Sequence, residues 1–253
     1  MYAEERQQAI LARARAKGRV DVVAMAEEFS VTTETIRRDL TVLERAGTLR
    51  RVHGGAIPVE RLGFEPALAA RETVMTDEKE RIAKAALEEL PGDGSVIIDA
   101  GSTTARLVRI MPTDRELTVI VNSPPHATVL ATRPNLHVIM LGGRVRGRTL
   151  ATVDDWVLRP LADLCVDVAF MATNGCSAAR GLTTPDQPEA AAKRAMIEAS
   201  RRRVLLADHT KMGDDHLVRF APLSAIDVII TDTGLDTERA GELAAAGPEI
   251  IRV

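Results

Sequence analysis

Residues 99–104 have the sequence DAGSTT, which combines a carboxylate, a glycine and three hydroxyl groups. They follow the apolar run Val96–Ile98 and lead into a helical pattern over 103–111. Glycine allows a tight turn out of a strand, and a helix N-terminus presents N–H groups and a positive dipole end. The combination favours an anion such as a phosphate. The alternative is that Ser102 and Thr103 only cap the helix.

Polar and glycine residues follow the other apolar runs as well. The segments concerned are Asn122-Ser123, Gly142-Gly143-Arg144, Thr173-Asn174-Gly175 and Asp208-His209-Thr210-Lys211. Open α/β sheets bind ligands at the carboxyl ends of their strands, so we predict a ligand site there. His209 beside Asp208 could form a metal or acid/base site. No ligand cluster accompanies it, so we interpret it as a hydrogen-bonding group and predict no metal.

Glu189 and Lys193 are a further pair of interest. They are spaced i, i+4 in a helical pattern over 188–201, so they share one helix face and can pair. The alternative is a solvated ion pair on a surface helix, which contributes little.

A second chemical group is basic. Thr35–His53 holds five arginines and two acidic residues. Residues 1–58 carry ten Lys and Arg against eight Asp and Glu, whereas the remainder carries 23 against 28, so the net charge of −3 hides an asymmetry. A basic stripe on one small domain is typical of proteins that read duplex DNA.

The arginines need helices to position them. The pattern predicts a first helix over 4–16 and a second over 22–29, which Asp21 caps. Thr32 or Thr33 caps a third helix, whose core face is Ile36, Leu40 and Leu43. The side chains left outside near its start are Thr32, Thr33, Glu34, Thr35, Arg37 and Arg38. A recognition helix presents such positions to the major groove.

Residues 48–57 predict a hairpin, because two short β-prone pieces flank Gly54-Gly55. Arg50, Arg51 and His53 on this wing would lie along the phosphate backbone. We therefore expect a winged helix-turn-helix over 1–57, a linker rich in Pro and Gly over 58–74, and a second domain over 75–253.

The second domain alternates apolar runs with helical patterns. The runs are 96–99, 118–121, 136–141, 166–171, 204–207, 228–231 and 249–253, and the helices are 77–90, 103–111, 124–132, 154–163, 188–201 and 236–246. This alternation predicts a Rossmann-like, mostly parallel α/β sheet with helices on both faces.

The composition excludes several classes. No apolar run approaches the roughly 20 residues of a membrane span, and the start MYAEERQQAI has no signal core, so we expect a cytoplasmic protein. Two cysteines, Cys165 and Cys176, are too few for a disulfide framework, and we expect both to pack as small hydrophobic groups. Aromatic residues make up only 2%, which argues against single-strand binding through stacking. We predict no cofactor.

The run FSVTTETIRRDLTVLERAGTLRRVHGGA resembles the DNA-binding signature of the DeoR/GlpR family of bacterial regulators. The segments DAGSTT, VNS, LGG, DVAFMATNG, GLTTPD, EAAAKRAM and LADHTKMG resemble its effector domain, in the same order. That domain is similar to ribose-5-phosphate isomerase and the coenzyme A transferases, and family members bind phosphorylated sugars. Asp154 stands where the family commonly has glycine, which puts the local backbone or pocket in question.

The resemblance implies which residues face the effector. Gly101 to Thr104 would hold its phosphate. Together with the strand-end segments, the expected ligand-binding residues are Asp99, Gly101, Ser102, Thr103, Thr104, Asn122, Ser123, Gly142, Gly143, Asn174, Gly175, Glu189, Lys193 and Lys211.

The leading hypothesis is a transcriptional regulator, a repressor of a sugar catabolism operon. It would bind double-stranded operator DNA as a dimer or tetramer and respond to a phosphorylated sugar. The alternative is a sugar-phosphate isomerase or acyl-CoA-using transferase with a DNA-binding appendage, in which Asp99 or Glu189 serves as the base. No recognisable set of catalytic loops accompanies these carboxylates, which favours the regulator. A constitutive architectural DNA binder is a third option, against which the polar strand ends argue.

Overall fold

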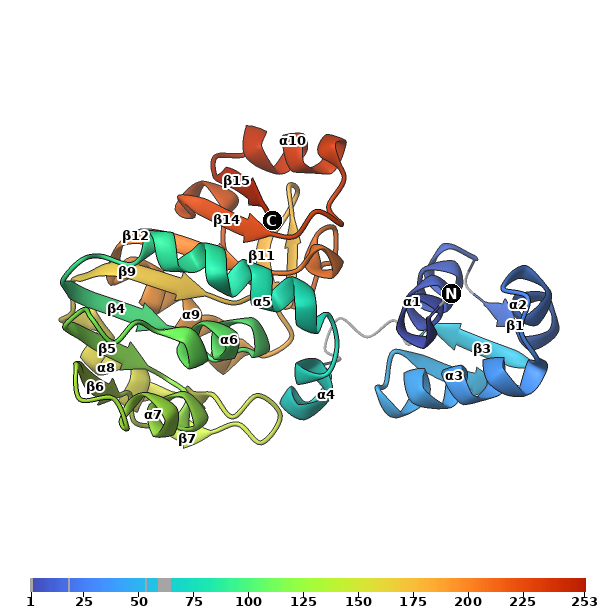
Figure 1. The fold of residues 1–253 in the computed structure, drawn as a ribbon, viewed down its shortest axis with the longest axis horizontal. Helices are drawn as coiled ribbons and strands as arrows, with labels where there is room; N and C mark the ends of the chain where they lie inside the picture. The colour runs from blue at the N-terminus through green and yellow to red at the C-terminus, as the bar shows by residue number, and fades with distance from the viewer. Residues whose placement is uncertain (1, 18, 53, 59–64) are drawn as a thin grey trace. The chain divides into compact units, whose positions relative to one another are not determined.

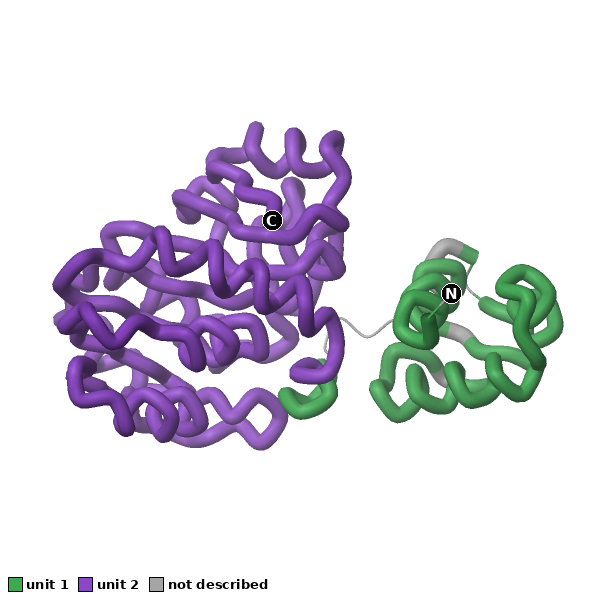
Figure 2. The backbone as a smooth tube through the Cα atoms, in the orientation of Figure 1, with its two compact units in different colours: residues 1–70 green, residues 71–253 purple. Residues whose placement is uncertain are grey.

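The chain folds as two compact units, unit 1 over Met1–Ala70 and unit 2 over Arg71–Val253 (Figure 2). The computed structural model describes residues 2–17, 19–52, 54–58 and 65–253; at positions 15, 16, 50 and 57 it describes the backbone alone. Across the described residues, no helix combines the length and the apolar composition that a membrane span requires.

Unit 1 has the predicted helices. They are α1 (Ala3–Lys17), α2 (Val22–Glu28) and α3 (Thr33–Arg45) (Figure 1). Asp21 caps α2, because its carboxylate accepts from the backbone N–H of Val23 (2.9 Å) and Ala24 (3.2 Å). The apolar faces of the three helices form one buried core that includes Ile10, Met25 and Leu40.

The predicted wing is present and belongs to a three-stranded antiparallel sheet in the order β1-β3-β2. Its strands are β1 (Val20–Asp21), β2 (Leu49–Val52) and β3 (Gly55–Pro58). A side chain at position 55 would meet the Val20 carbonyl oxygen at 2.0 Å, so only glycine allows this close strand approach. The two-residue β1 is too short to show alternation in the sequence.

In residues 71–253, all of which are described, seven parallel strands form one sheet in the order β15-β14-β12-β9-β4-β5-β6. The strands are β4 (Gly94–Ile98), β5 (Leu117–Val121), β6 (Leu136–Met140), β9 (Val166–Met171), β12 (Ser200–Leu206), β14 (Val228–Thr231) and β15 (Glu249–Arg252). The chain builds outward from β4 through β5 and β6, then restarts at β9 and builds the other way. The strand order therefore reverses between β4 and β9, which is where such sheets bind ligands.

Helices cover both faces of the sheet (Figure 1). Helices α5 (Thr76–Ala85), α6 (Ser102–Ile110) and α7 (Pro124–Leu130) pack on one face, and α8 (Asp155–Ala162), α9 (Gln187–Glu198) and α10 (Thr237–Ala245) share the core on the other. Successive strand residues alternate between these cores: Ile97 belongs to the α9 side and Ile98 to the α6 side. The predicted mostly parallel α/β fold is confirmed.

Short elements escaped the sequence patterns. They are a second antiparallel sheet of β10 (Gly175–Ser177), β11 (Gly181–Thr184) and β13 (Val218–Ala221), the pair β7 (Arg144–Val145) with β8 (Thr152–Val153), and the 3₁₀ turns η1 (Ala86–Glu89), η2 (His209–Lys211) and η3 (Leu223–Ala225). Strands of two to four residues are too short for a period of two to show. The segment 58–74, predicted as a linker, contains helix α4 (Leu68–Glu72), and its residues 59–64 lie outside the described part.

The two cysteines differ in their surroundings. Cys176 on β10 is buried, and burial raises the pKa of its thiol to about 12. Cys165 is exposed, so the expectation that both pack in the core is wrong for this residue. It lies in the turn between α8 and β9, where the chain reaches the surface.

His126 is the buried titratable group of α7. Its ring hydrogen-bonds to the Gly101 backbone, and its Nδ1 finds no partner within the described part of the chain. Burial lowers the pKa of His126 to about 4. Because the unfolded chain binds this proton near pH 6.5, the free energy of unfolding must fall as the pH drops from 6.5 towards 4.

We predict that unit 2 of the wild type loses about 2 kcal/mol of unfolding free energy through His126 between pH 7 and pH 5. His126→Gln should remove this loss, and the matched variant His137→Gln, at an exposed position of β6, should keep it. Urea titrations at both pH values measure the difference. An unchanged pH dependence in His126→Gln would contradict the assignment.

Candidate functional site

Helix α3 is positioned as a recognition helix. Thr32 is its N-cap, since its Oγ1 accepts from the Thr35 N–H at 3.2 Å. Ile36, Leu40 and Leu43 are buried on its inner face, as the sequence predicts. The predicted contact residues in the first turn, Thr32, Thr33, Glu34 and Thr35, are exposed or partly exposed.

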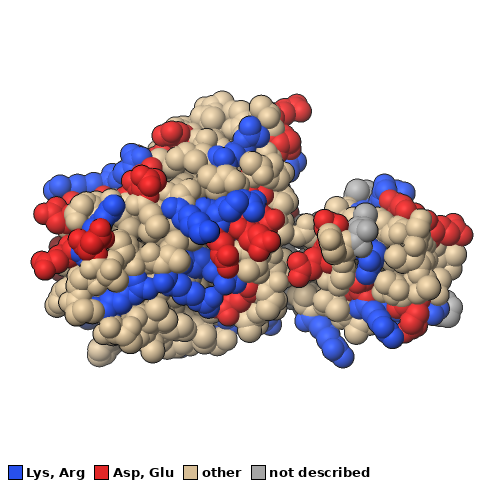
Figure 3. All heavy atoms as spheres, in the orientation of Figure 1, with Lys and Arg blue, Asp and Glu red and all other residues tan. Residues whose placement is uncertain are grey.

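Arg37 and Arg38 project from the outer face of α3. Their side chains are 52% and 81% exposed, and both reach Glu34 only loosely, at 3.7 Å and 4.0 Å. Exposed ion pairs of this kind contribute at most about 1 kcal/mol, so both guanidinium groups can exchange Glu34 for a phosphate or a guanine edge. Lys and Arg side chains project from unit 1 over α3 (Figure 3).

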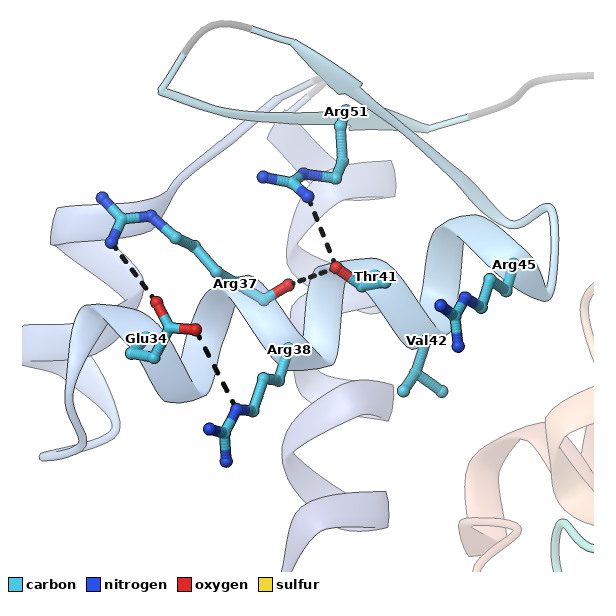
Figure 4. A pocket seen from close by; sticks show the side chains of 7 residues that line it. All are labelled: Glu34, Arg37, Arg38, Thr41, Val42, Arg45 and Arg51. Atoms are coloured by element: carbon cyan, nitrogen blue, oxygen red, sulfur yellow. Dashed lines mark hydrogen bonds and ion pairs between the residues drawn. The ribbon is translucent and has the colours of Figure 1, made fainter.

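The same face forms a shallow hollow, shown in Figure 4. It is lined by Glu34, Arg37, Arg38, Thr41, Val42, Arg45 and Arg51. Arg51 reaches in from β2 and donates to the Thr41 Oγ1 at 3.4 Å, and that hydroxyl donates to the Arg37 carbonyl oxygen at 2.8 Å. Wing and helix thus present one basic surface. Of the other predicted wing residues, His53 and the side chain of Arg50 lie outside the described residues.

The expected DNA contacts did not include Thr41, Val42 or Arg45, although Arg45 is one of the five arginines of Thr35–His53. The three residues continue the outer face of α3 at the spacing of Arg37 and Arg38, which was the signal available. The sequence reasoning also missed Asp39, which is buried and accepts from Arg6 Nε (2.6 Å) and Gln7 Nε2 (2.9 Å). This pair fixes α3 against α1 and so sets where the outer face points.

The second candidate site lies where the strand order reverses. Asp99 follows β4 and Ala172 follows β9. Gly101 is the N-cap of α6, and a side chain there would meet the Ala172 Cβ at 2.8 Å, so glycine permits the close approach of these two strand ends.

The hydroxyls of the Gly101 loop do not cap the helix. Ser102 and Thr103 are buried, and within the described residues no side chain makes a capping hydrogen bond to α6. Thr104 instead donates to the Gly101 carbonyl oxygen at 3.1 Å. The interpretation that Ser102 and Thr103 only cap the helix is therefore wrong, and the first turn of α6 keeps its positive dipole end for another partner.

Asp99 and Lys193 form a fully buried ion pair beside this loop. The Lys193 Nζ lies 2.5 Å from the Asp99 Oδ2 and donates to the Ala172 carbonyl oxygen at 3.1 Å. The side chains are 0% and 2% exposed. Burial raises the pKa of Asp99, while Lys193 and the Ala172 N–H stabilise its charged form. The other carboxylate oxygen, Oδ1, has no hydrogen-bond partner among the described residues.

Asn122, at the end of β5, offers the complementary group. Its Oδ1 accepts from the Ala100 N–H at 2.8 Å, which fixes the amide orientation. Its Nδ2 is buried and finds no partner in the described chain. A buried unpartnered polar atom costs free energy, typically about 1–3 kcal/mol. Asp99 Oδ1 accepts and Asn122 Nδ2 donates, so a ligand hydroxyl group would suit both.

Glu189 is held in a polar network that the sequence did not reveal. Arg146 pairs with Glu189 and, at 3.2 Å, with Asp186, and the Thr149 hydroxyl donates to Glu189 at 3.2 Å. The predicted contact between Glu189 and Lys193 is present at 3.7 Å, but both residues are buried, so the surface-pair interpretation is wrong.

The remaining residues that the sequence predicts for the ligand site differ in their surroundings. Ser123 is the buried N-cap of α7, and Asn174 accepts from the Thr184 hydroxyl at 3.0 Å. Gly143 and Gly175 have a packing reason, since a side chain at either position would meet a backbone oxygen at 2.3 Å. Gly142 is exposed. Lys211 belongs to a separate charged group with Asp208 and Lys79.

Asp154 and His209, whose roles the sequence left open, both have structural roles. Asp154 has φ 77° and ψ −172°, a backbone region that glycine adopts readily, and its carboxylate accepts from Arg144 Nε at 2.8 Å. His209 pairs through Nδ1 with Asp232 at 2.6 Å rather than with Asp208, and this bond raises the pKa of His209. Within the described ranges, His, Cys, Asp and Glu side chains form no group of three that could hold a metal ion.

Comparisons with known proteins cover both units. The model of the DeoR-like helix-turn-helix domain matches residues 6–61, and that of the DeoR C terminal sensor domain matches residues 74–233. The HTH-type transcriptional regulator GlpR of Haloferax volcanii is 36% identical over 230 residues, 91% of this chain and 90% of that protein.

A second relative, the glycerol-3-phosphate regulon repressor of Escherichia coli, is 29% identical over 232 residues, 92% of each chain. Among solved structures, ribose 5 phosphate isomerase A from Neisseria gonorrhoeae matches with a TM-score of 0.40 and 18% identity, over 54% of this chain and 53% of that one. Together with the helix-turn-helix and the α/β unit, the family matches lead to one conclusion: the chain belongs to the DeoR family of DNA-binding transcriptional regulators.

Proposed function

We propose that this protein represses a sugar catabolism operon and that a phosphorylated sugar, bound at the carboxyl ends of β4, β5 and β9, controls its operator affinity. The observation that carries the effector assignment is the pair of buried atoms, Asp99 Oδ1 and Asn122 Nδ2, beside the Gly101–Thr104 loop. They match a sugar hydroxyl, and the loop at the start of α6 matches a phosphate.

The DNA-binding role rests on the basic face of α3 and β2. Arg37, Arg38, Arg45 and Arg51 surround one hollow, whose described lining includes one acidic residue, Glu34. We propose that the start of α3 enters the major groove while Arg50, Arg51 and His53 of the wing lie along the backbone. A dimer or tetramer in the cytoplasm would place two such helices on a repeated operator.

We propose that the effector site binds without turnover. Isomerisation requires a free carboxylate base next to the substrate. Glu189 is tied to Arg146 and Thr149, and Asp99 is tied to Lys193 and the Ala172 N–H. Each carboxylate therefore has an oxygen held by a cation, which fixes its position and favours binding over proton abstraction.

Operator DNA for binding measurements can be selected from a random pool by the wild-type protein. Arg37→Ala and Arg38→Ala should each weaken binding by about 1–3 kcal/mol, because each removes a contact to a base or a phosphate. Arg13→Ala, which removes an arginine of α1, is the matched control and should bind as the wild type does. Fluorescence anisotropy gives the affinities, and wild-type affinity in the folded double variant would refute the assignment.

The second prediction concerns the Gly101–Thr104 loop. Thr103→Glu places a carboxylate at the start of α6, where it repels an incoming phosphate. The release of DNA by the effector should be lost, because the phosphate can no longer enter the loop. The effector is the compound that most raises the melting temperature among glucose 6-phosphate, fructose 1-phosphate, fructose 6-phosphate and glycerol 3-phosphate.

Thr132→Glu, at an exposed position after α7, adds the same charge away from the loop and should respond as the wild type does. Circular dichroism checks that both variants are folded. If Thr103→Glu still releases DNA at the wild-type effector concentration, the phosphate is held elsewhere.

A further inference from the structure

Unit 2 begins with a segment whose carbonyl groups are gripped by cationic side chains. Lys79 Nζ donates to the Arg71 carbonyl oxygen at 2.6 Å and to the Val74 carbonyl oxygen at 2.7 Å. Arg106 Nη2 donates to the Glu72 carbonyl oxygen at 2.9 Å. Residues 71–74 follow directly after unit 1, so these bonds hold the point where the chain from the DNA-binding unit enters unit 2.

The next residue has an unfavourable backbone conformation. Met75 has φ 54° and ψ 45°, in the left-handed region that a residue with a side chain rarely adopts. Such a conformation persists only where its surroundings hold it. Lys79 contacts Val74, directly before Met75, through Nζ, and its backbone N–H makes the first helical bond of α5, to the Met75 carbonyl oxygen at 3.0 Å.

Lys79 also belongs to the charges at the strand ends. It is buried on α5, and burial lowers its pKa to about 8. Asp208, buried after β12, stabilises the charged form of Lys79 and also interacts with Lys211. Asp208 thus interacts both with Lys79 and with Lys211, one of the expected ligand-binding residues.

Arg106 provides a second connection. It lies on α6, one turn after the Gly101–Thr104 loop, and its Nη1 is 3.7 Å from Glu80 of α5. Helix α6, which carries Arg106, therefore begins at the Gly101–Thr104 loop. Helix α5 carries Lys79, which interacts with Asp208 at the end of β12. An anion bound at the Gly101–Thr104 loop changes the field on Arg106 and Lys79.

We propose that Lys79 is a positioning residue that clamps residues 71–74, and that an anion at the strand ends loosens this clamp; the second half rests on the proposed function. An anion at the Gly101–Thr104 loop lies at the start of α6, the helix whose Arg106 holds the Glu72 carbonyl oxygen and lies 3.7 Å from Glu80 of α5. Its charge attracts the cations that hold residues 71–74, Arg106 and Lys79, away from the carbonyl oxygens. Residues 71–74, which follow directly after unit 1 in the chain, are then released from unit 2.

Trypsin reports on this clamp directly, because it cuts after Arg71 and must capture the very carbonyl group that Lys79 holds. We would follow the fragment beginning at Glu72 by mass spectrometry in the full-length protein. Lys79→Met removes the donors, Lys79→Arg keeps a donating cation, and Lys84→Met, at an exposed position of the same helix, is the matched control. Where Lys79→Met fails to fold, Arg106→Gln removes the bond to the Glu72 carbonyl oxygen, together with the ion pair to Glu80, and leaves both bonds of Lys79 in place.

In the absence of ligand, Lys79→Met should release the fragment at least about tenfold faster than the wild type, since cleavage follows local opening. Lys79→Arg and Lys84→Met should stay within about twofold. Arg106→Gln should fall between the two groups. The clamp is refuted if folded Lys79→Met is cleaved at the wild-type rate. Where Lys79→Met does not fold, cleavage of Arg106→Gln at the wild-type rate refutes it.

The ligand arm uses inorganic phosphate and the four phosphate esters of the screen. A compound that protects the Gly101–Thr104 amides from hydrogen exchange should accelerate cleavage after Arg71 severalfold in the wild type and leave Lys79→Met unchanged. Protection of the loop without faster cleavage overturns the coupling. If no compound protects the loop, both the proposed effector site and its coupling to the clamp are refuted. The cleavage rates without ligand still test whether Lys79 holds residues 71–74.

Discussion

The structure of unit 2 depends on one buried ion pair, that of Asp99 with Lys193. Two charges taken out of water are costly unless their remaining hydrogen-bonding capacity is filled. The surrounding chain fills most of it: the Ala172 N–H binds one oxygen of Asp99, and the Ala172 carbonyl oxygen binds Lys193. The pair thereby joins α9 to the ends of β4 and β9 at the reversal of strand order. The other carboxylate oxygen, Oδ1, has no partner in the described chain.

Several other features follow from this arrangement. Because β4 and β9 end so close together, position 101 has to be glycine. Because Lys193 turns towards Asp99, Glu189 needs other cations, and Arg146 supplies one. The fixed part of the site is thus rigid and charged, whereas the group around Lys79, Asp208 and Lys211 reaches the segment through which unit 1 is attached. Asp99 and Asp208 follow β4 and β12, so both groups lie at the carboxyl ends of the parallel strands.

The strands of the large sheet and the orientation of α3 could be predicted from the sequence, because both depend on local patterns of apolar residues. The apolar runs located the strands of the large sheet, and Ile36, Leu40 and Leu43 oriented α3. The contacts of Arg146 with Glu189, 43 residues away, and of Asp39 with Arg6, 33 away, leave no local signal. Lys193 is a similar case: its spacing from Glu189 predicted the longer contact, while its shorter contact is with Asp99, 94 residues away. The short strands β7, β8 and β10 lacked enough residues to show a period.

We propose that effector and operator oppose each other's binding to this protein, and thermodynamic linkage makes this opposition directly measurable. If a sugar phosphate weakens operator binding by some factor, operator binding must weaken the sugar phosphate by the same factor, commonly about 5- to 150-fold. Isothermal titration of the effector into the protein, alone and saturated with its selected operator, gives both dissociation constants. We predict a weaker effector constant on the DNA-bound protein, by the factor found for DNA release. Equal constants in the two titrations would contradict the account.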